Sequence, residues 1–462
     1  MAQTGARPDS GHIEAAAPSA RSMRQVAVTA LAGTSIEWFD FFLYGTAAAI
    51  VFPTVFFAED MPYYVSLMAS FSTFAIGFLA RPIGGIVFGH FGDRLGRKKA
   101  LVTALMLMGA ATTLIGLLPS YATIGALAPV LLMVLRFAQG LAVGGQWGGA
   151  MLLVTENAPA GQRGFYGAFA QAGAPVGLIL ANAAFLAVTA SVSPEAFMDW
   201  GWRVPFVASI ALIALSLYVQ LRLEDTPAFK ELEARKSARH TERLSDEDVA
   251  AIAVARQSPV LEALVTYPKQ IALAAGAFLA VQVTFYILIS FVIAYGTHPD
   301  GIGASRDTML LAVLISSALQ LPALFIASIY SDRHGRRGVY MLGAAMLGVW
   351  AFAIFPLIDT GSFLWITVSL SVGQLLVGLM YGPQAAFLAE LFSTHVRYSG
   401  ASLGYQFGAI LGGALAPIIA TALFASTGST IGIAVYIAIA CALTVLSVYL
   451  LSETNQRDLN AG

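Results

Sequence analysis

The chain has 462 residues, of which 58% are apolar and only 11% are charged, and its mean hydropathy is +0.75. Soluble domains are usually about 45–50% apolar and about 25% charged, so this composition argues strongly against a water-soluble enzyme. It also excludes disorder for most of the chain, and a net charge of −1 gives no reason to expect nucleic-acid binding. The apolar residues form long blocks instead of alternating with polar ones, which indicates membrane helices and not a membrane β-barrel.

Twelve apolar segments of about 20 residues or more, the length needed to cross a bilayer, follow a polar head at residues 1–23. No short apolar segment with a cleavage site precedes them, so the first is an uncleaved span. In chain order the predicted spans are 26–53, 63–88, 99–118, 126–155, 164–190, 203–221, 270–296, 306–329, 339–358, 363–389, 398–425 and 430–451. These predict two six-helix bundles at 24–221 and 270–452, joined by a cytoplasmic linker with short helices at 222–269 and followed by a tail at 453–462.

The positions of Lys and Arg orient these spans. Of the 25 such residues, all but Arg81, Arg136, Arg203 and Arg306 fall in the head, the linker, the tail or the loops on one side of the predicted bilayer. Loops rich in Lys and Arg stay in the cytoplasm, so we expect both termini to be cytoplasmic. Losing one span from the count would destroy this asymmetry.

The two halves repeat a charged motif after their second span. Residues 89–99 read GHFGDRLGRKK and residues 331–337 read SDRHGRR. An acid and a base also recur at equal spacing after the fourth span of each half, as Glu156 with Arg163 and Glu390 with Arg397. Duplicated halves are typical of transporters whose site lies between the repeats near the middle of the membrane.

These segments resemble the major facilitator superfamily. The GHFGDRLGRKK loop resembles its hallmark, and other segments resemble its metabolite:proton symporters: EWFDF at 37–41, RPIGG at 81–85, GGQWGG at 144–149, WGWRVPF at 200–206 and EDTPAF at 224–229. The nearest pattern is the shikimate transporter branch, in RYSGA at 397–401 and GYQ at 404–406. The resemblance covers about residues 24–457, but Gln146 stands where the family usually has Glu. It implies a monomeric carrier of the bacterial inner membrane that works by alternating access.

Charged residues inside the predicted spans are few, and each costs about 2.5–3.5 kcal/mol at the bilayer centre, so function is the default reading. Apart from end positions such as Asp307 and Glu390, they are Glu37, Asp40, Arg81 and Arg136. A rise of about 1.5 Å per residue places Glu37 and Arg136 near the midplane, Asp40 one turn further out and Arg81 near the inner end. Polar residues on the same helical stripes, or in the second half, complete the predicted site for substrate and protons: Tyr44, Gln139, Gln146, Gln171, Gln282, Tyr286 and Gln374, with Gln320, Tyr381, Gln384, Tyr405 and Gln406 as further candidates.

The charged loops predict a cytoplasmic latch between the two halves. By the resemblance, Asp93 approaches the start of the eleventh span, and by the repeat Asp332 faces the start of the fifth. Arg97 is expected to pair with Glu156, and Arg336 with Glu390. The full set of predicted gating residues is Arg81, Asp93, Arg94, Arg97, Glu156, Arg163, Asp332, Arg336, Glu390 and Arg397.

The sequence therefore predicts proton-coupled uptake of a small organic acid, such as a shikimate-like acid or a dicarboxylate, with Arg136 holding a carboxylate through a forked pair of hydrogen bonds. Two alternatives stay open: a carrier of zwitterionic osmolytes such as betaine or proline, and a facilitator or exporter of organic acids. An enzyme is not expected, because no metal-ligand spacing, cofactor motif or nucleophile–base pair is present in the sequence. The expected partners are the solute, protons and the lipid bilayer, without cofactor, metal or nucleic acid, and the proton gradient is the driving force.

Overall fold

The structure, a computed structural model, describes residues 20–95, 97–144, 151, 154–155, 158–159, 161–224, 264–392 and 397–455. The described residues are helical apart from short turns and connections. The predicted linker 222–269 lies mostly outside the described residues, as do most of the head and the end of the tail.

Twelve long helical segments follow one another along the chain. Those of the first half are α1 (Ala20–Ile50), α3 (Tyr63–Leu95), α4 (Arg97–Leu117), α6 (Leu127–Gly144), α8 (Arg163–Thr189) and α10 (Arg203–Glu224). Those of the second half are α14 (Pro268–Tyr286) continued by η2 (Ile287–Phe291) and α15 (Val292–Thr297), α16 (Arg306–His334), α17 (Arg336–Ile358), α18 (Phe363–Leu391), α19 (Arg397–Gly408) continued by η3 (Ala409–Ala414) and α20 (Ala416–Thr427), and α21 (Ile431–Leu450). Short helices α2 (Phe52–Val55), α5 (Tyr121–Ile124), α9 (Pro194–Ala196) and η1 (Phe197–Gly201) lie between spans.

The predicted twelve spans are accounted for by these helices. Ten helical stretches are long and apolar enough to cross a membrane. The bent pair Pro194–Gly201 and Arg203–Leu215 makes an eleventh, and the shorter apolar helix Val102–Leu117 makes the twelfth. Several helices extend beyond the predicted spans: α1 begins at Ala20 and so includes the last residues of the predicted head, and α3 and α16 continue to Leu95 and His334. A helix does not have to end where its apolar stretch ends, since water satisfies the backbone groups outside the bilayer.

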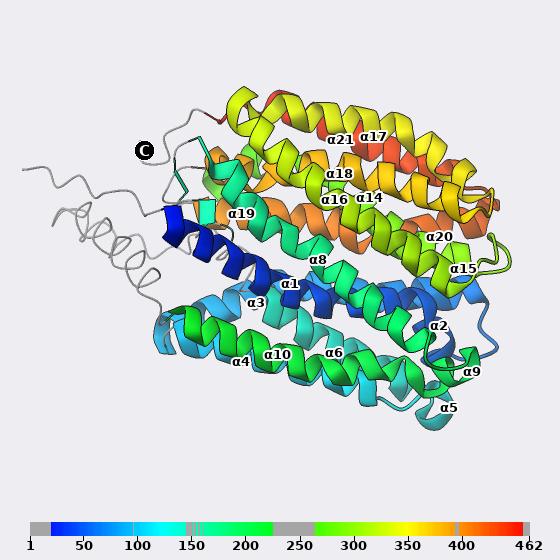
Figure 1. Ribbon diagram of the computed structural model, residues 1–462. Coiled ribbons are helices and arrows are strands. Elements are labelled where there is room, and N and C mark those ends of the chain that lie inside the picture. The colour runs from blue at the N-terminus through cyan, green and yellow to red at the C-terminus, as the bar shows by residue number, and fades with distance from the viewer. Residues whose placement is uncertain are drawn as a thin grey trace, which may run out of the picture.

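The helices form two groups that meet along the middle of the molecule (Figure 1). Between the groups, α8 packs on α16 and α18, and α3 packs on η3 and α20. The fifth span thus meets the eighth while the second meets the eleventh, as expected for two duplicated halves facing each other. The start of α1 and the end of α21 lie at the same end of the molecule (Figure 1), which we call the latch end. The first and last spans thus begin and end on one side, which agrees with an even number of spans.

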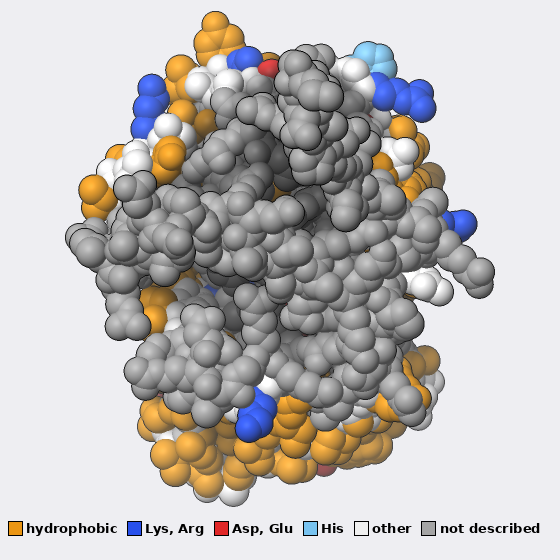
Figure 2. Space-filling model, turned by 90° about the vertical axis from the view of Figure 1, so that its left-hand side faces the viewer, with side chains coloured by type: hydrophobic (Ala, Val, Ile, Leu, Met, Phe, Trp, Pro, Cys, Tyr) orange, Lys and Arg blue, Asp and Glu red, His pale blue; other side chains and the backbone are white. Residues whose placement is uncertain are grey.

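The surface suits a bilayer. Large apolar side chains are exposed along the spans, for example Ile86, Val349 and Phe352. Viewed from the latch end, hydrophobic side chains cover the flanks, whereas Lys, Arg and His side chains gather near the rim (Figure 2). Lipid tails cannot hydrogen-bond a backbone, so such flanks require helices whose backbone groups are satisfied internally.

A close approach of two helices sets the position of the buried charges in the first half. Gly140 and Gly144 on α6 lie directly against the backbone of Gly77 and Arg81 on α3, with no room for a Cβ. A Cβ on Gly77 would also lie 2.6 Å from Nε of Arg136. Small residues allow such contact between membrane helices. They bring Arg81 and Arg136 to the same side of α1.

Candidate functional site

Asp40 and Arg136 are joined by a buried network within the first half. Oδ2 of Asp40 accepts hydrogen bonds from Thr112 on α4 and from Nε2 of Gln139 on α6, the latter at 3.2 Å. Nη1 of Arg136 donates to Oε1 of Gln139 at 3.1 Å. Gln139 therefore bridges the acid and the base, which form no direct ion pair in the described part of the chain. Asp40 and Arg136 are only 2% and 1% exposed.

Aromatic rings surround the guanidinium of Arg136. Its Cζ lies 4.3 Å from the ring centre of Phe41, 4.2 Å from that of Tyr44 and 4.8 Å from that of Phe74. The hydroxyl of Tyr44 donates to Thr73 at 2.6 Å, which leaves the face of the ring for the cation. Nε and Nη2 of Arg136 have no hydrogen-bond partner among the described residues. The hydrogen bond and the ring contacts of Arg136 all come from the first half.

Arg81 lies in a second aromatic cage. Its Cζ is 4.2 Å from the ring centre of Phe41, 4.7 Å from that of Phe78 and 5.4 Å from that of Trp38. The apolar part of α3 ends at Phe88, as predicted, and the expected depth of Arg81 near the inner end of that span stays a prediction. Within the described structure, Nε and Nη2 of Arg81 also lack hydrogen-bond partners.

The second half reaches Arg81. Tyr405 of α19 interacts with Arg81 and also with Gln282 of α14. Tyr286 packs edge-on against Phe78 and at an angle to Phe74, at ring-centre distances of 5.2 and 5.8 Å. Arg81 therefore lies between the halves, whereas the hydrogen bond and ring contacts of Arg136 come from the first half and its interaction with Tyr286 of the second half is electrostatic.

Glu37 interacts electrostatically with Arg81, and among the described residues its carboxylate forms no direct ion pair or hydrogen bond. Glu37 and Asp40 are one turn apart on α1. The structure thus places an acid near each arginine along this helix, Glu37 near Arg81 and Asp40 near Arg136, without a direct ion pair in either case.

Several of the predicted amide side chains lie between helices. Nε2 of Gln171 on α8 donates to the backbone oxygen of Tyr381 on α18 at 3.2 Å, which links the two halves. Gln320 on α16 and Gln374 on α18 are fully buried, and within the described chain neither amide has a hydrogen-bond partner. Such groups cost about 1–3 kcal/mol each when unpaired, so this pair favours a polar solute or water nearby.

The sequence analysis did not identify Thr112 or the aromatic cages. Thr112 is one of many hydroxyl residues in the spans, and no pattern distinguishes it. Phe41 and Trp38 belong to the EWFDF segment, but a sequence does not show that two arginines from other helices will stack on them. Gln146 and Glu156 lie outside the described residues, and so do the side chains of Asp93, Arg94, Arg97 and Arg397. Their roles stay predictions.

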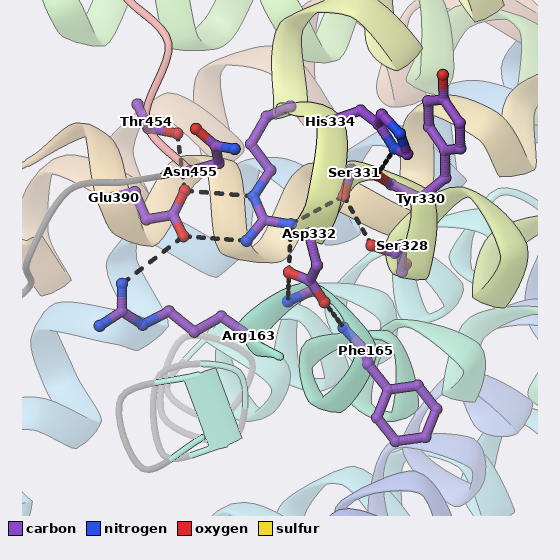
Figure 3. A network of polar contacts seen from close by, with 12 residues as sticks. Arg163, Phe165, Ser328, Tyr330, Ser331, Asp332, His334, Glu390, Thr454 and Asn455 are labelled. Carbon is purple, nitrogen blue, oxygen red and sulfur yellow. Dashed lines mark hydrogen bonds and ion pairs between the residues drawn. The ribbon is translucent and has the colours of Figure 1, made fainter. Parts of the chain in front are cut away.

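At the latch end, Asp332 binds across the two halves (Figure 3). Its carboxylate accepts hydrogen bonds from the backbone N–H groups of Gly164, at 2.8 Å, and Phe165, at 2.9 Å, in the first turn of α8. A helix N-terminus attracts an anion because its first N–H groups are unpaired and its dipole is positive there. The contact between Asp332 and the fifth span that the repeat predicts is present.

Arg336 ties this contact to Glu390. Its guanidinium lies 2.6 Å from Asp332 and donates twice to the carboxylate of Glu390, at 3.1 and 3.3 Å. Arg163 of the first half approaches the same carboxylate at 4.0 Å (Figure 3). The side chains of Arg336, Asp332 and Glu390 are at most 4% exposed. The predicted pairing of Arg336 with Glu390 is present as a buried, forked ion pair.

The segment after α21 supports this cluster. The carboxylate of Glu453 accepts hydrogen bonds from the backbone N–H groups of Arg336, at 2.8 Å, and Arg337, at 3.1 Å, at the start of α17. Thr454 donates to Glu390 at 2.7 Å. Partial burial opposes ionisation of Glu453, but its hydrogen bonds from four backbone N–H groups outweigh that effect and hold its pKa below the usual range.

We expect Glu453→Gln to lower the melting temperature at neutral pH but not in acid. The pKa of Glu453 is depressed in the folded state, so its stabilisation is present above the unfolded pKa of about 4.3 and is lost as the pH falls through the folded pKa. The effect should be small, about 0.5–1 kcal/mol, because the site is partly exposed to screening solvent. Thermal unfolding of the detergent-purified protein at a series of pH values measures it. A difference between variant and wild type that persists unchanged in acid would contradict this account.

The opposite end also holds contacts between the halves. His298, after α15, stacks on Tyr63 at the start of α3, with ring centres 3.9 Å apart. Beside them lies a cavity of about 430 Å³ whose lining includes Arg306 and Asp307. A larger cavity of about 830 Å³ lies among the loops of the first half at this end. Since Glu37, Asp40, Arg81 and Arg136 are at most 9% exposed, the charged centre is closed off in this arrangement.

Comparison with known proteins shows which family the chain belongs to. The profile of the family described as "Sugar (and other) transporter" matches residues 26–461. The chain belongs to this transporter family. Its relatives in Escherichia coli (strain K12) include the inner membrane metabolite transport protein YhjE, which is 41% identical over 95% of this chain and 96% of its own length. The shikimate transporter is 35% identical over 97% of this chain and 98% of its own length. The proline/betaine transporter is 32% identical over 95% of this chain and 85% of its own length.

The fold of this sugar-transporter family member is that of the major facilitator superfamily. A solved structure of the superfamily's proton:xylose symporter XylE superposes with a TM-score of 0.70, over 94% of this chain and 96% of that one, at 17% identity. The chain is therefore a multi-pass membrane transporter and not an enzyme. The duplication, the twelve spans and the two facing halves expected from the sequence agree with that fold.

Proposed function

We propose that this transporter takes up a small organic acid together with protons, by alternating access, in the bacterial inner membrane. The observation that carries the proposal is Arg81, a buried guanidinium between the two halves whose Nε and Nη2 lack hydrogen-bond partners in the described structure. A carboxylate forms two parallel hydrogen bonds with a guanidinium, which suits an anionic solute. This assigns the carboxylate to Arg81, whereas the sequence favoured Arg136.

We assign the proton to Asp40, in the buried network that links it to Arg136. Asp40 is buried and receives hydrogen bonds from Thr112 and Gln139, and one of its oxygens, Oδ1, has no partner among the described residues. A carboxylate in such a place is costly while charged and is relieved by taking up a proton. In the proposed cycle, substrate and proton together reduce the uncompensated charge of the centre, and the loaded carrier then rocks between its two open states. No cofactor is needed, and one chain contains the whole site.

The alternative substrate, a zwitterionic osmolyte, is less well supported. Quaternary ammonium groups are bound by aromatic cages. Here the cages formed around Phe41 are already occupied by Arg81 and Arg136. The unpaired amides of Gln320 and Gln374 suit hydroxyl or carbonyl groups, which a hydroxylated acid offers and betaine's methyl groups do not.

Uptake into proteoliposomes tests the proposal. We expect shikimate or another hydroxy or dicarboxylic acid from a panel to accumulate, faster as the external pH falls, and a protonophore to abolish the accumulation. Arg81→Lys keeps the charge but loses the fork, so it should raise the KM for the acid about tenfold or more. Accumulation of glycine betaine or proline in place of acids would favour the alternative. Uptake that ignores both pH and protonophore would identify a facilitator.

A further inference from the structure

One ring in the centre of the molecule contacts both buried arginines. Phe41 on α1 is 4% exposed. Its ring centre lies 4.2 Å from Cζ of Arg81 and 4.3 Å from Cζ of Arg136. The other rings of the two cages each contact one arginine: Trp38 and Phe78 contact Arg81, and Tyr44 and Phe74 contact Arg136. Among the described residues, Phe41 is thus the one aromatic ring that both guanidinium groups contact at cation–π distance, while Tyr286 of the second half interacts electrostatically with both.

The ring of Phe41 stabilises the two guanidinium groups where hydrogen-bond partners are missing. Each guanidinium leaves Nε and Nη2 without a partner in the part of the chain that is described. The negative face of an aromatic ring attracts a cation, and the attraction grows when water is excluded. The electrostatic stabilisation of each guanidinium therefore depends in part on how closely it contacts Phe41. A movement of one arginine on the ring changes the space and the electrostatic attraction available to the other.

The two arginines otherwise belong to different polar networks. Arg81 interacts with Glu37 and with Tyr405 of the second half. Arg136 is linked through Gln139 to Asp40. No hydrogen bond or ion pair between the described residues joins these two networks directly. Besides the electrostatic interactions of the two arginines with each other and with Tyr286, the ring of Phe41 is the contact that the two networks have in common.

We propose that Phe41 is a positioning residue that couples substrate binding at Arg81 to protonation of Asp40. A substrate carboxylate draws Arg81 off the ring, and Arg136 then settles more fully on Phe41. This movement takes Arg136 away from Gln139, so Asp40 loses its positive neighbour and binds a proton from the external solution. When the substrate leaves, Arg81 returns to the ring and the proton is released. This inference rests on the proposed function and adds to it how the two sites communicate.

The test separates coupling from binding. Wild type and variants are reconstituted into proteoliposomes with radiolabelled shikimate and glycine betaine as probes. Two quantities are measured: stimulation of net uptake as the external pH falls from about 8 to about 5, and exchange of the probe at equal pH on both sides. We expect Phe41→Leu to reduce the stimulation of uptake by low external pH about tenfold and to reduce the rate of exchange far less. Phe41→Tyr keeps the ring and should keep the stimulation.

Phe42→Leu is the matched control. Phe42 is also a buried ring of α1, it packs on Trp38, Phe41, Phe285 and Tyr286, and it has no cation contact in the described structure. Equal loss of stimulation in Phe42→Leu would show a general packing effect and overturn the proposal. Wild-type stimulation in Phe41→Leu would also overturn it. Phe41→Met provides a second ring-free variant, and loss of exchange in both ring-free variants would assign Phe41 to binding or folding instead. If the wild type moves neither probe nor any acid of the panel, the proposed function itself fails.

Discussion

Replacing Asp40 by Asn is expected to abolish accumulation of substrate against its gradient, with net uptake falling roughly 100-fold, while exchange across the membrane survives. Asn is nearly isosteric and still accepts hydrogen bonds from Thr112 and Gln139, so the network keeps its shape. It cannot bind and release a proton. A carrier that has lost its titrating group moves substrate in both directions without drawing on the proton gradient.

The measurement compares proton-driven uptake with exchange in the same proteoliposomes. Thr46→Val is a suitable control, because Thr46 is a buried hydroxyl on the same helix whose partner, Asn182, lies outside the network of Asp40. The control should lose neither activity. Retention of pH-stimulated accumulation by Asp40→Asn would move the proton site away from Asp40, and Glu37 would then be the next acid to replace. Loss of both activities would point to a structural role.

The residue types of this site could be predicted from the sequence because the membrane makes polar residues conspicuous. Glu37, Asp40, Arg81 and Arg136 stand out in apolar spans, where each charge is costly. The helical rise also predicted that Asp40 and Arg136 lie at similar depths, and the structure links the two through Gln139. The duplicated motifs also predicted that Asp332 contacts the start of the fifth span and that Arg336 pairs with Glu390, and both contacts are present.

The pairing of these charges could not be predicted. Whether Arg136 meets Glu37 or Asp40 depends on how closely α6 approaches α3, and that distance is set by backbone contacts at Gly140 and Gly144. Those glycines are visible in the sequence, but their partners are not. Arg81 was assigned to a gate because of its distance from the end of its span, and its contact with the ring of Phe41 could not be predicted from that distance. Aromatic residues are so common in membrane spans that a cage cannot be recognised before the fold is known.

A substitution in the ion-pair cluster at the latch end is expected to have the second large effect on uptake. Arg336→Gln is expected to reduce net uptake at least about tenfold and to open the latch end, because it leaves the carboxylates of Asp332 and Glu390 buried without their shared cation. Removing one partner of a buried ion pair typically costs about 3–5 kcal/mol. Asp332 also accepts hydrogen bonds from the backbone of Gly164 and Phe165, so the substitution should weaken the contact between the two halves. The closed state should therefore lose population relative to the state in which this end is open.

Distances between spin labels on the two halves at the latch end measure this shift directly, and uptake measures its consequence. Arg337→Gln is the matched control, since Arg337 donates to backbone oxygens of Val448 and Tyr449 and takes no part in the ion-pair cluster. Gly164→Ala tests the same contact without removing a charge, because its Cβ would lie 2.6 Å from Nη1 of Arg336 and 2.9 Å from Oδ1 of Asp332. If both Arg336→Gln and Gly164→Ala leave the label distances unchanged, the cluster stabilises the second half alone. If they lengthen the distances while Arg337→Gln does not, the buried cluster holds the halves together, and its strength sets how readily the carrier opens toward that side.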